Sequence, residues 1–248
     1  MMSSPRRYGL LLTAGPLLIL SACAPATAGR GVQSSPRVLI VGGGSSHDFP
    51  QWFQRADSAT LARAGIPARY TDTPSQVAAR LTNVDVLYFT ANQPHPDPAT
   101  REAIFLHVAS GKGLVIGHAG AWYNWSDWPE YNRLLVGGGT RGHRRLGEFE
   151  VIVTAPDHPV MRGVPAAFSV TDELYRFMPD SDGAAIGDVL ATAREVETGT
   201  VYPIVFTVEN PNARVVVNTL GHDGDAHDHP AYQRILENSV RWVSGPTP

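Results

Sequence analysis

One stretch decides the fold of this chain: Arg37-Val38-Leu39-Ile40-Val41-Gly42-Gly43-Gly44. Residues 38–41 are continuously apolar up to the glycines, a pattern typical of a strand that is covered on both faces of its sheet. Runs of the same type recur at residues 84–89, 113–117 and 214–219. We therefore expect a central sheet whose strands are buried on both sides.

Helical patterns lie between these strands, at residues 50–64, 75–81 and 97–110. Because strand and helix alternate along the chain, we expect a parallel sheet with right-handed crossovers. A last amphipathic helix over residues 230–243 is predicted to close the domain.

The second half of the chain has a different pattern. Residues 148–153, 189–195 and 201–208 are predicted to be strands joined by hairpin turns, so the sheet should be mixed at one edge. Residues 119–145 are rich in aromatic residues and glycine without periodicity. We expect a long functional loop there, outside the core.

Length and charge limit the class of protein. Residues 37–244 supply some 200 positions, enough for one domain with a substantial core but not for two. The 20 basic and 23 acidic residues form no basic stripe, so we expect no nucleic-acid partner. Oligomeric state is left open, a homo-oligomer included.

The first residues have the order of a bacterial lipoprotein signal. Arg6 and Arg7 precede an apolar stretch at residues 9–20. That stretch is about a dozen residues long, too short for a membrane span of roughly 20. Cys23, the only cysteine, ends a Leu-Ser-Ala-Cys lipobox. A buried N-terminal helix is the weaker alternative because no amphipathic face is visible.

We therefore expect a signal peptide at residues 1–22, acylation of Cys23 and a flexible tether at residues 23–36. The acyl chains would anchor an exported protein that faces the periplasm or the cell exterior. The Sec and twin-arginine routes both stay open, as do the inner and outer membranes. An acylated Cys23 leaves no thiol for catalysis or for metal binding.

Four histidines stand where a ligand would bind. In an open parallel sheet the ligand lies beyond the carboxyl ends of the strands. His47, His118 and His222 each follow a predicted strand closely, and His143 lies in the long segment after residue 119. One such histidine alone is more often structural, but their common placement favours a site.

Acidic residues could complete that site. Glu173, next to Asp172, is a candidate ligand or general base, with a surface acid pair as the rival interpretation. The tract at residues 222–229 holds three histidines and three aspartates, yet polar glycine-containing runs are usually solvated loops. Only His222 of that tract is therefore nominated.

The aromatic tract at residues 122–131 suits carbohydrate. Aromatic rings stack on the apolar faces of sugars, while Asp and Asn bind hydroxyls. A segment that covers its own hydrophobic floor is an equally strong alternative. The candidate substrate-binding residues are Trp122, Trp125, Trp128, Tyr131 and Tyr175.

A series of short motifs resembles the ThuA-like (trehalose utilisation) family. In chain order they are Gly117-His118-Ala119, Trp128-Pro129 with Tyr131, Gly137-Gly138-Gly139 before His143, His158-Pro159, Thr171-Asp172-Glu173-Leu174-Tyr175-Arg176-Phe177, Val189-Leu190-Ala191-Thr192, Pro203-Ile204 and Leu220-Gly221-His222. No single motif is specific, but together they cover nearly all of residues 37–243.

The resemblance implies a class I glutamine amidotransferase-like fold, which is a flavodoxin-like three-layer α/β sandwich with a mostly parallel central sheet. True amidotransferases carry a nucleophilic cysteine after a central strand, where this chain has Gly117-His118-Ala119-Gly120. Glutaminase chemistry is therefore excluded. The family is linked to trehalose, related sugars and their keto derivatives, and its recurrent His and Glu positions correspond here to His47, His118, His143, Glu173 and His222. The chain departs from the commoner pattern at Gly120-Ala121, which affects the expected shape of the pocket.

Two hypotheses follow. The first is an exported enzyme, a hydrolase, lyase or isomerase, that acts on a carbohydrate or keto-sugar through His118, Glu173 and His47. A divalent metal, Zn, Mn or Fe, would be held by His118, His143, Glu173 and His222. The second is a non-catalytic sugar-binding lipoprotein that uses the aromatic residues as a platform. The enzyme needs the His and Glu side chains to converge, whereas the binding protein needs only aromatic residues along a cleft.

Overall fold

The computed structural model describes residues 1, 2, 4, 9 and 35–246. The chain divides into two units, Met1–Ser34 and Ser35–Pro248, and the second contains all the secondary structure given below. The predicted lipidation site Cys23 and most of the predicted signal and tether lie outside the described residues. No helix in the described part of the chain is long and apolar enough to cross a membrane.

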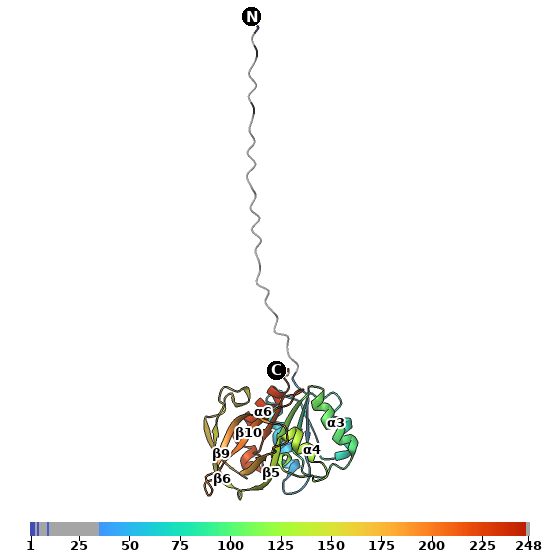
Figure 1. Ribbon diagram of the computed structural model, residues 1–248, viewed down its shortest axis with the longest axis vertical. Coiled ribbons are helices and arrows are strands. Elements are labelled where there is room, and N and C mark those ends of the chain that lie inside the picture. The colour runs from blue at the N-terminus through green and yellow to red at the C-terminus, as the bar shows by residue number, and fades with distance from the viewer. Residues whose placement is uncertain (3, 5–8, 10–34, 247–248) are drawn as a thin grey trace. The chain divides into compact units, whose positions relative to one another are not determined.

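A nine-stranded mixed sheet forms the centre of the domain (Figure 1). Five strands pair in parallel, in the order β2 (Ala68–Thr71), β1 (Val38–Val41), β3 (Val86–Phe89), β4 (Gly113–Gly117) and β11 (Val215–Asn218). Four antiparallel strands continue the sheet: β10 (Val201–Val208), β9 (Ile186–Arg194), β6 (Gly147–Val153) and β7 (Ala167–Asp172). The α/β class with a parallel centre is confirmed, although the antiparallel part is wider than a single edge.

Helices cover both faces of the sheet. One face carries η1 (Pro50–Asp57), α1 (Ser58–Arg63) and α6 (Pro230–Val243), and the other carries α2 (Val77–Arg80), α3 (Pro98–Ala109) and α4 (Pro129–Tyr131). Successive strand residues point to opposite faces. In β1, accordingly, Val38 and Ile40 join one hydrophobic cluster while Leu39 and Val41 join the other. The continuous apolar runs therefore have the physical cause expected from the sequence.

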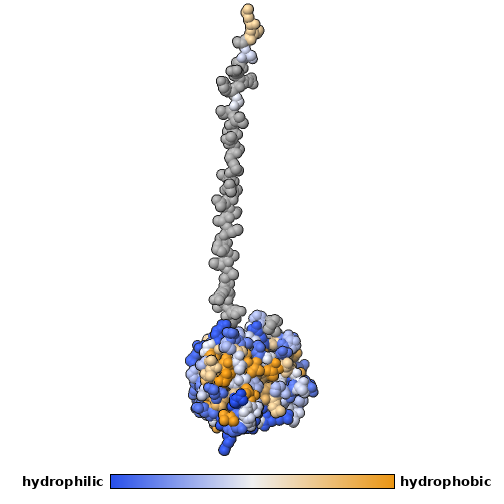
Figure 2. Space-filling view, turned by 60° about the vertical axis from the view of Figure 1, so that its left-hand side comes forward, coloured by the Kyte–Doolittle hydropathy of each residue, from blue (hydrophilic) through white to orange (hydrophobic). Residues whose placement is uncertain are grey.

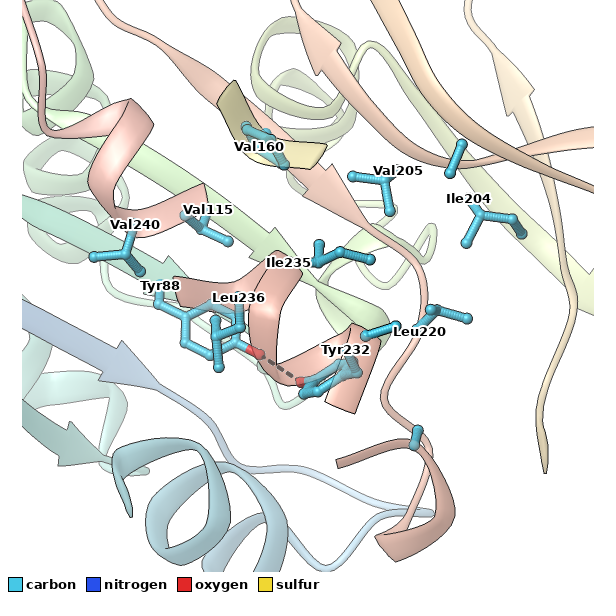
Figure 3. Close-up of a cluster of buried hydrophobic side chains, with 14 of the residues drawn as sticks. Tyr88, Val115, Val160, Ile204, Val205, Leu220, Tyr232, Ile235, Leu236 and Val240 are labelled. Atoms are coloured by element: carbon cyan, nitrogen blue, oxygen red, sulfur yellow. Dashed lines mark hydrogen bonds between the residues drawn. The ribbon is translucent and has the colours of Figure 1, made fainter. Parts of the chain in front are cut away.

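Helix α6 closes one layer. Its N-terminus has Pro230 at the first position and His229 as a cap that accepts from the Ala231 amide. Figure 3 shows the buried side chains of the helix, among them Tyr232 and Ile235, against Tyr88 of β3 and Val115 of β4. Each such side chain contributes roughly 1.5–3 kcal/mol when fully buried.

The segment at residues 119–145 is part of the core, so the expectation of a loop there is wrong. It contains the end of η3 (His118–Ala121), α4, η4 (Asn132–Val136) and β5 (Gly138–His143), which pairs with β8 (Tyr175–Pro179) in a second small sheet. Leu135 and Val136 are buried beside the strands of the main sheet. No periodicity is visible in the sequence because each element is too short to repeat a pattern.

Three further short elements complete the domain: η2 (Pro74–Gln76), η5 (Pro159–Met161) and α5 (Gly224–His227). The face seen in Figure 2 shows apolar patches set among polar residues. Exposed large apolar residues of the described chain include Leu106, Met178 and Val196. Some exposed apolar side chains are common on the surface of a folded domain.

Candidate functional site

Four chain segments meet at the carboxyl ends of the central strands. His47 follows β1, His118 follows β4, and His222 follows β11, while Glu173 follows β7 of the antiparallel half. One ligand atom from each of these four residues lies within 4.8 Å of the others. The predicted convergence of His118 and His222 is found, because their ring centroids lie 5.8 Å apart.

Glu173 stands at the centre of the group. Its Oε2 lies 3.6 Å from His118 Nε2 and 3.3 Å from His222 Nδ1. Neither nitrogen meets the geometry of a hydrogen bond. The spacing is that of ligand atoms around a common point, and it is looser than the spacing of a directly hydrogen-bonded pair.

Backbone carbonyls fix the orientation of two of the imidazoles. Nδ1 of His118 donates to the Thr219 carbonyl at 2.7 Å, and Nδ1 of His47 lies 3.2 Å from the Ser45 carbonyl. Since a carbonyl can only accept, both Nδ1 atoms carry the proton and both Nε2 lone pairs are left free. Metal-binding histidines are usually oriented in this way by their second nitrogen.

Three nitrogens of the group are buried without a hydrogen-bond partner among the described residues: His47 Nε2, His118 Nε2 and His222 Nδ1. A buried polar atom without a partner costs roughly 1–3 kcal/mol, so three in one place point to a ligand that satisfies them together. Neutral imidazoles and a carboxylate are a donor set that suits Zn, Mn or Fe.

The electrostatics favour a carboxylate and at least one neutral imidazole. Burial alone would raise the pKa of the Glu173 carboxyl, but His118 and His222 lower it well below its usual range. Burial, reinforced by His118 and His222, lowers the pKa of His47 to about 3. The Glu173 carboxylate raises the pKa of His222 against the effect of burial. At neutral pH, Glu173 and His47 are therefore in the protonation states that bind a cation.

His143 lies beside the four-residue cluster. Its Nδ1 is 2.8 Å from the Arg144 carbonyl and 3.4 Å from Glu173 Oε1. The sequence hypothesis named His143 a ligand and His47 a catalytic group. The geometry puts His47 within the cluster and His143 on the other oxygen of Glu173.

Two further residues support the cluster and were not predicted. Asp172 is fully buried and accepts the amides of Glu173 at 2.7 Å, Gly221 at 2.7 Å and His222 at 3.2 Å. It thus ties together two of the segments that carry the cluster. Its position in the Asp-Glu pair was visible in the sequence, but its inward direction was not.

The second is Asn92, which holds the loop that bears His47. Its side chain accepts from the Ser45 amide at 2.9 Å and donates to the Ser45 carbonyl at 3.0 Å. Gly44 has a φ of +137°, and a Cβ there would lie 1.7 Å from Asn92 Oδ1. The third glycine of the triplet is therefore required for this contact.

The backbone of His118 is unusual. This residue has a φ of +31°, one of three positive values among the described non-glycine residues. Backbone strain of this kind persists where the surroundings over-determine it, and it is concentrated at functional sites. Here the turn directly after β4 places the His118 imidazole against the ring of Tyr175, and the two ring centroids lie 4.4 Å apart.

A cavity of about 390 Å³ opens onto the cluster. Its wall includes Trp122, Asn124, His143 and Tyr175 together with Ser45 and Ser46. Trp122 packs edge-on against both His143 and Tyr175. Two of the predicted aromatic residues therefore line the cavity.

Burial contradicts the predicted sugar platform at Trp128 and Tyr131, whereas Trp125 is also buried but lines the second cavity, described next. The exposed fractions of Trp125, Trp128 and Tyr131 are 6%, 3% and 0%, and they pack on one another and on Phe89 in the core. They cover the hydrophobic floor beneath their own segment, which was the alternative interpretation. None of the three lines the 390 Å³ cavity.

A second cavity, of about 520 Å³, lies beside this segment. Its lining includes Tyr123, Asn132, Arg141 and Asp180. Asn132 is 1% exposed and donates to the carbonyls of Trp122 and Gly138, while its Oδ1 has no hydrogen-bond partner among the described residues. The guanidinium of Arg141 lies over the Tyr123 ring, 4.2 Å from its centroid. This cavity combines acceptors, cations and an aromatic ring.

Comparison with known proteins places these observations in a family. The family model described as ThuA, trehalose utilisation, matches residues 37–243. A ThuA-like protein of Parabacteroides merdae has 24% identity and a TM-score of 0.74, over 85% of this chain and 90% of that chain. One of Bacteroides uniformis has 22% identity and a TM-score of 0.68, over 89% and 95%. At these identities the likeness shows the fold alone. No curated protein matches the chain.

Proposed function

The chain belongs to the ThuA, trehalose utilisation, family over residues 37–243, and from that premise we propose that it binds a divalent metal and acts on a carbohydrate or keto-sugar. The metal ligands are His47, His118, Glu173 and His222. We also propose that the protein is exported and anchored to a membrane through Cys23. The reaction is a hydrolysis, elimination or isomerisation.

One observation carries the metal proposal. Three buried imidazole nitrogens without partners and one carboxylate oxygen gather within 4.8 Å. Hydrogen bonds within the described part of the chain leave the three nitrogens unsatisfied, whereas one cation would satisfy them together with the carboxylate oxygen.

A bound divalent metal would supply Lewis-acid chemistry, polarising a hydroxyl or carbonyl oxygen or lowering the pKa of water. The chain supplies the remaining functions. His143 is on the cavity wall 3.4 Å from Glu173 Oε1, where its imidazole can exchange a proton with a sugar hydroxyl. Trp122 offers an apolar wall for one face of a sugar ring, and Asn124 offers amide groups to hydroxyls.

The test begins with the metal content of the full-length protein. We expect about one equivalent of Zn, Mn or Fe in the wild type, and loss of that metal in Glu173→Gln, which keeps the size of the side chain but not its charge. Glu150→Gln, at an exposed position on β6, is the matched control and should retain metal. Metal-loaded protein is then screened against disaccharides and their keto derivatives. A wild type that binds no more metal than Glu173→Gln would contradict the proposal.

A non-catalytic saccharide-binding protein is the second candidate. The 520 Å³ cavity favours it, because Asn132 Oδ1 and Asp180 offer acceptors to hydroxyls and Arg141 offers donors. The same screen separates the two functions. Saccharide binding that survives removal of metal and is weakened by Asp180→Ala supports this second candidate, whereas binding or turnover that requires metal supports the first.

A further inference from the structure

A buried ionic network lies directly behind the His222 segment. Asp57 and His227 are both 0% exposed, and His227 Nδ1 lies 2.7 Å from Asp57 Oδ1. The other carboxylate oxygen accepts from Tyr88 at 2.9 Å and from Tyr232 at 3.1 Å. Figure 3 shows the two tyrosines meeting, with their hydroxyl oxygens 3.2 Å apart. Every polar atom of the Asp57 carboxylate thus has a partner.

The second nitrogen of His227 reaches the backbone next to the proposed ligand. His227 Nε2 lies 3.1 Å from the Gly221 carbonyl. A carbonyl cannot donate, so this nitrogen carries a proton, and the carboxylate on the other side favours a proton on Nδ1 as well. His227 is therefore an imidazolium that pairs with Asp57 and donates to Gly221. Consistently, Asp57 raises the pKa of His227 against the effect of burial.

The peptide that precedes His222 is consequently held on both sides. His227 binds the carbonyl of Gly221, while the amides of Gly221 and His222 donate to Asp172. Gly221 itself has a φ of +129° and packs close to the Cβ of His118, so side chains are disfavoured there. The position of His222 is therefore set from behind by groups that do not enter the cavity.

We propose that the His227–Asp57 pair is a positioning device for the metal site, acting through the Gly221 carbonyl to fix His222 as a ligand. This inference rests on the proposed function. Substitutions behind a metal ligand typically cost 10–100-fold in metal affinity. A pair that merely stabilised the core would lower the melting temperature and leave the metal affinity of the folded protein unchanged.

Two substitutions that introduce an amide test the roles of the two ring nitrogens of His227 separately. His227→Gln can place its amide nitrogen where Nε2 was and keep the donor to Gly221. His227→Asn places its nitrogen near Nδ1 and keeps only the contact with Asp57. Both variants lose the positive charge of His227 and with it the ion pair to Asp57. A difference between the two variants therefore reports on the hydrogen bond to Gly221. His107→Asn is the control, because it removes another buried histidine whose Nε2 faces a backbone carbonyl, that of Gly113 at 3.2 Å.

Zinc affinity of full-length, folded protein is measured by competition with a chelator, and the visible spectrum of the Co²⁺-loaded protein reports the ligand geometry. We expect a 10–100-fold weaker affinity and an altered Co²⁺ spectrum for His227→Asn, with His227→Gln within about threefold of the wild type. His107→Asn should melt at a lower temperature with unchanged affinity.

The outcomes distinguish the two proposals. Equal affinities for wild type, His227→Asn and His227→Gln would overturn the positioning role while leaving the metal site intact. Equal losses in the two His227 variants would overturn the route through Gly221, since one of them keeps that donor. A wild type without zinc affinity would overturn the proposed function, and the positioning role with it.

Discussion

Burial lowers the pKa of several histidines in the described domain, and His95 is the simplest case. It is 0% exposed, and neither ring nitrogen has a hydrogen-bond partner among the described residues. Its ring packs against Phe89, Trp125 and Trp128. Burial, with a smaller effect from Arg101, lowers the pKa of His95 to about 4. The folded protein therefore keeps this imidazole neutral in mildly acidic solution.

This state predicts acid sensitivity of the metal-free protein. Between pH 6.5 and about 4 the unfolded chain takes up a proton at His95 and the folded chain does not, so the free energy of unfolding falls as the pH falls through that window. His107, whose pKa burial also lowers to about 4, acts in the same direction. In His95→Leu, the decrease of the free energy of unfolding on acidification should be smaller by on the order of 2–3 kcal/mol. Denaturant midpoints in EDTA between pH 7 and 4.5 measure it, and an unchanged pH slope in His95→Leu would refute the assignment.

At this scale the sequence identified the residues that follow strands. His47, His118 and His222 are predicted to converge because parallel strands end at one edge. Glu173 follows an antiparallel strand, so its nomination depends on the Asp-Glu pair and on the family resemblance. Asn92, Asp57 and His227 were missed. His227 belongs to a tract that has the composition of a solvated loop. His227 is the last residue of the short helix α5, which Asp223 caps at its N-terminus, and the side chain of His227 is buried.

Short elements explain most of what the sequence did not predict. The strands and the longer helices repeat their patterns over enough residues to be recognised, as α6 does over Pro230–Val243. Between residues 118 and 143 the chain instead makes four elements of six residues or fewer. Aromatic side chains there serve two purposes within a few positions. Trp122 lines the 390 Å³ cavity, whereas Trp128 is buried in the hydrophobic core and Trp125, also buried there, lines the 520 Å³ cavity.

Substitution of these tryptophans should separate the two purposes. Trp128→Ala removes a ring that is 3% exposed, so we expect a loss of about 3–5 kcal/mol and a thermal midpoint lower by roughly 10 °C. Trp122→Ala should leave the midpoint within a few degrees and weaken saccharide binding. Melting curves and binding to the saccharides found in the screen are compared for both variants. Equal destabilisation by the two substitutions would show that Trp122 is a core residue too.

At the scale of the whole molecule, the site depends on both halves of the sheet. His47, His118 and His222 come from the parallel half, whereas Glu173 comes from the end of β7 in the antiparallel half. Asp172, at the last position of β7, joins the two halves through the amides of Gly221 and His222. The cluster therefore requires the complete domain, and no single supersecondary unit contains it.

The proposed export of this domain would depend on residues outside the described structure. The apolar stretch at residues 9–20 is too short for a membrane span, so under the proposed export the attachment would depend on Cys23 in the Leu-Ser-Ala-Cys sequence. Acylation by more than one chain gives stable anchoring, which one chain alone does not.

Substitution of Cys23 tests this arrangement directly. In Cys23→Ser the hydroxyl cannot accept the diacylglycerol that a thiol takes, so the protein should leave the membrane fraction while remaining folded, with an unchanged melting temperature. Ser21→Ala keeps the thiol and should remain with the membranes through a high-salt wash, because acyl chains hold by the hydrophobic effect and not by charge. Metabolic labelling with a fatty acid should mark the wild type and Ser21→Ala but not Cys23→Ser. Membrane association of Cys23→Ser after loss of residues 1–22, or an unlabelled wild type, would contradict the lipoprotein assignment and leave the domain to be secreted or retained without an anchor.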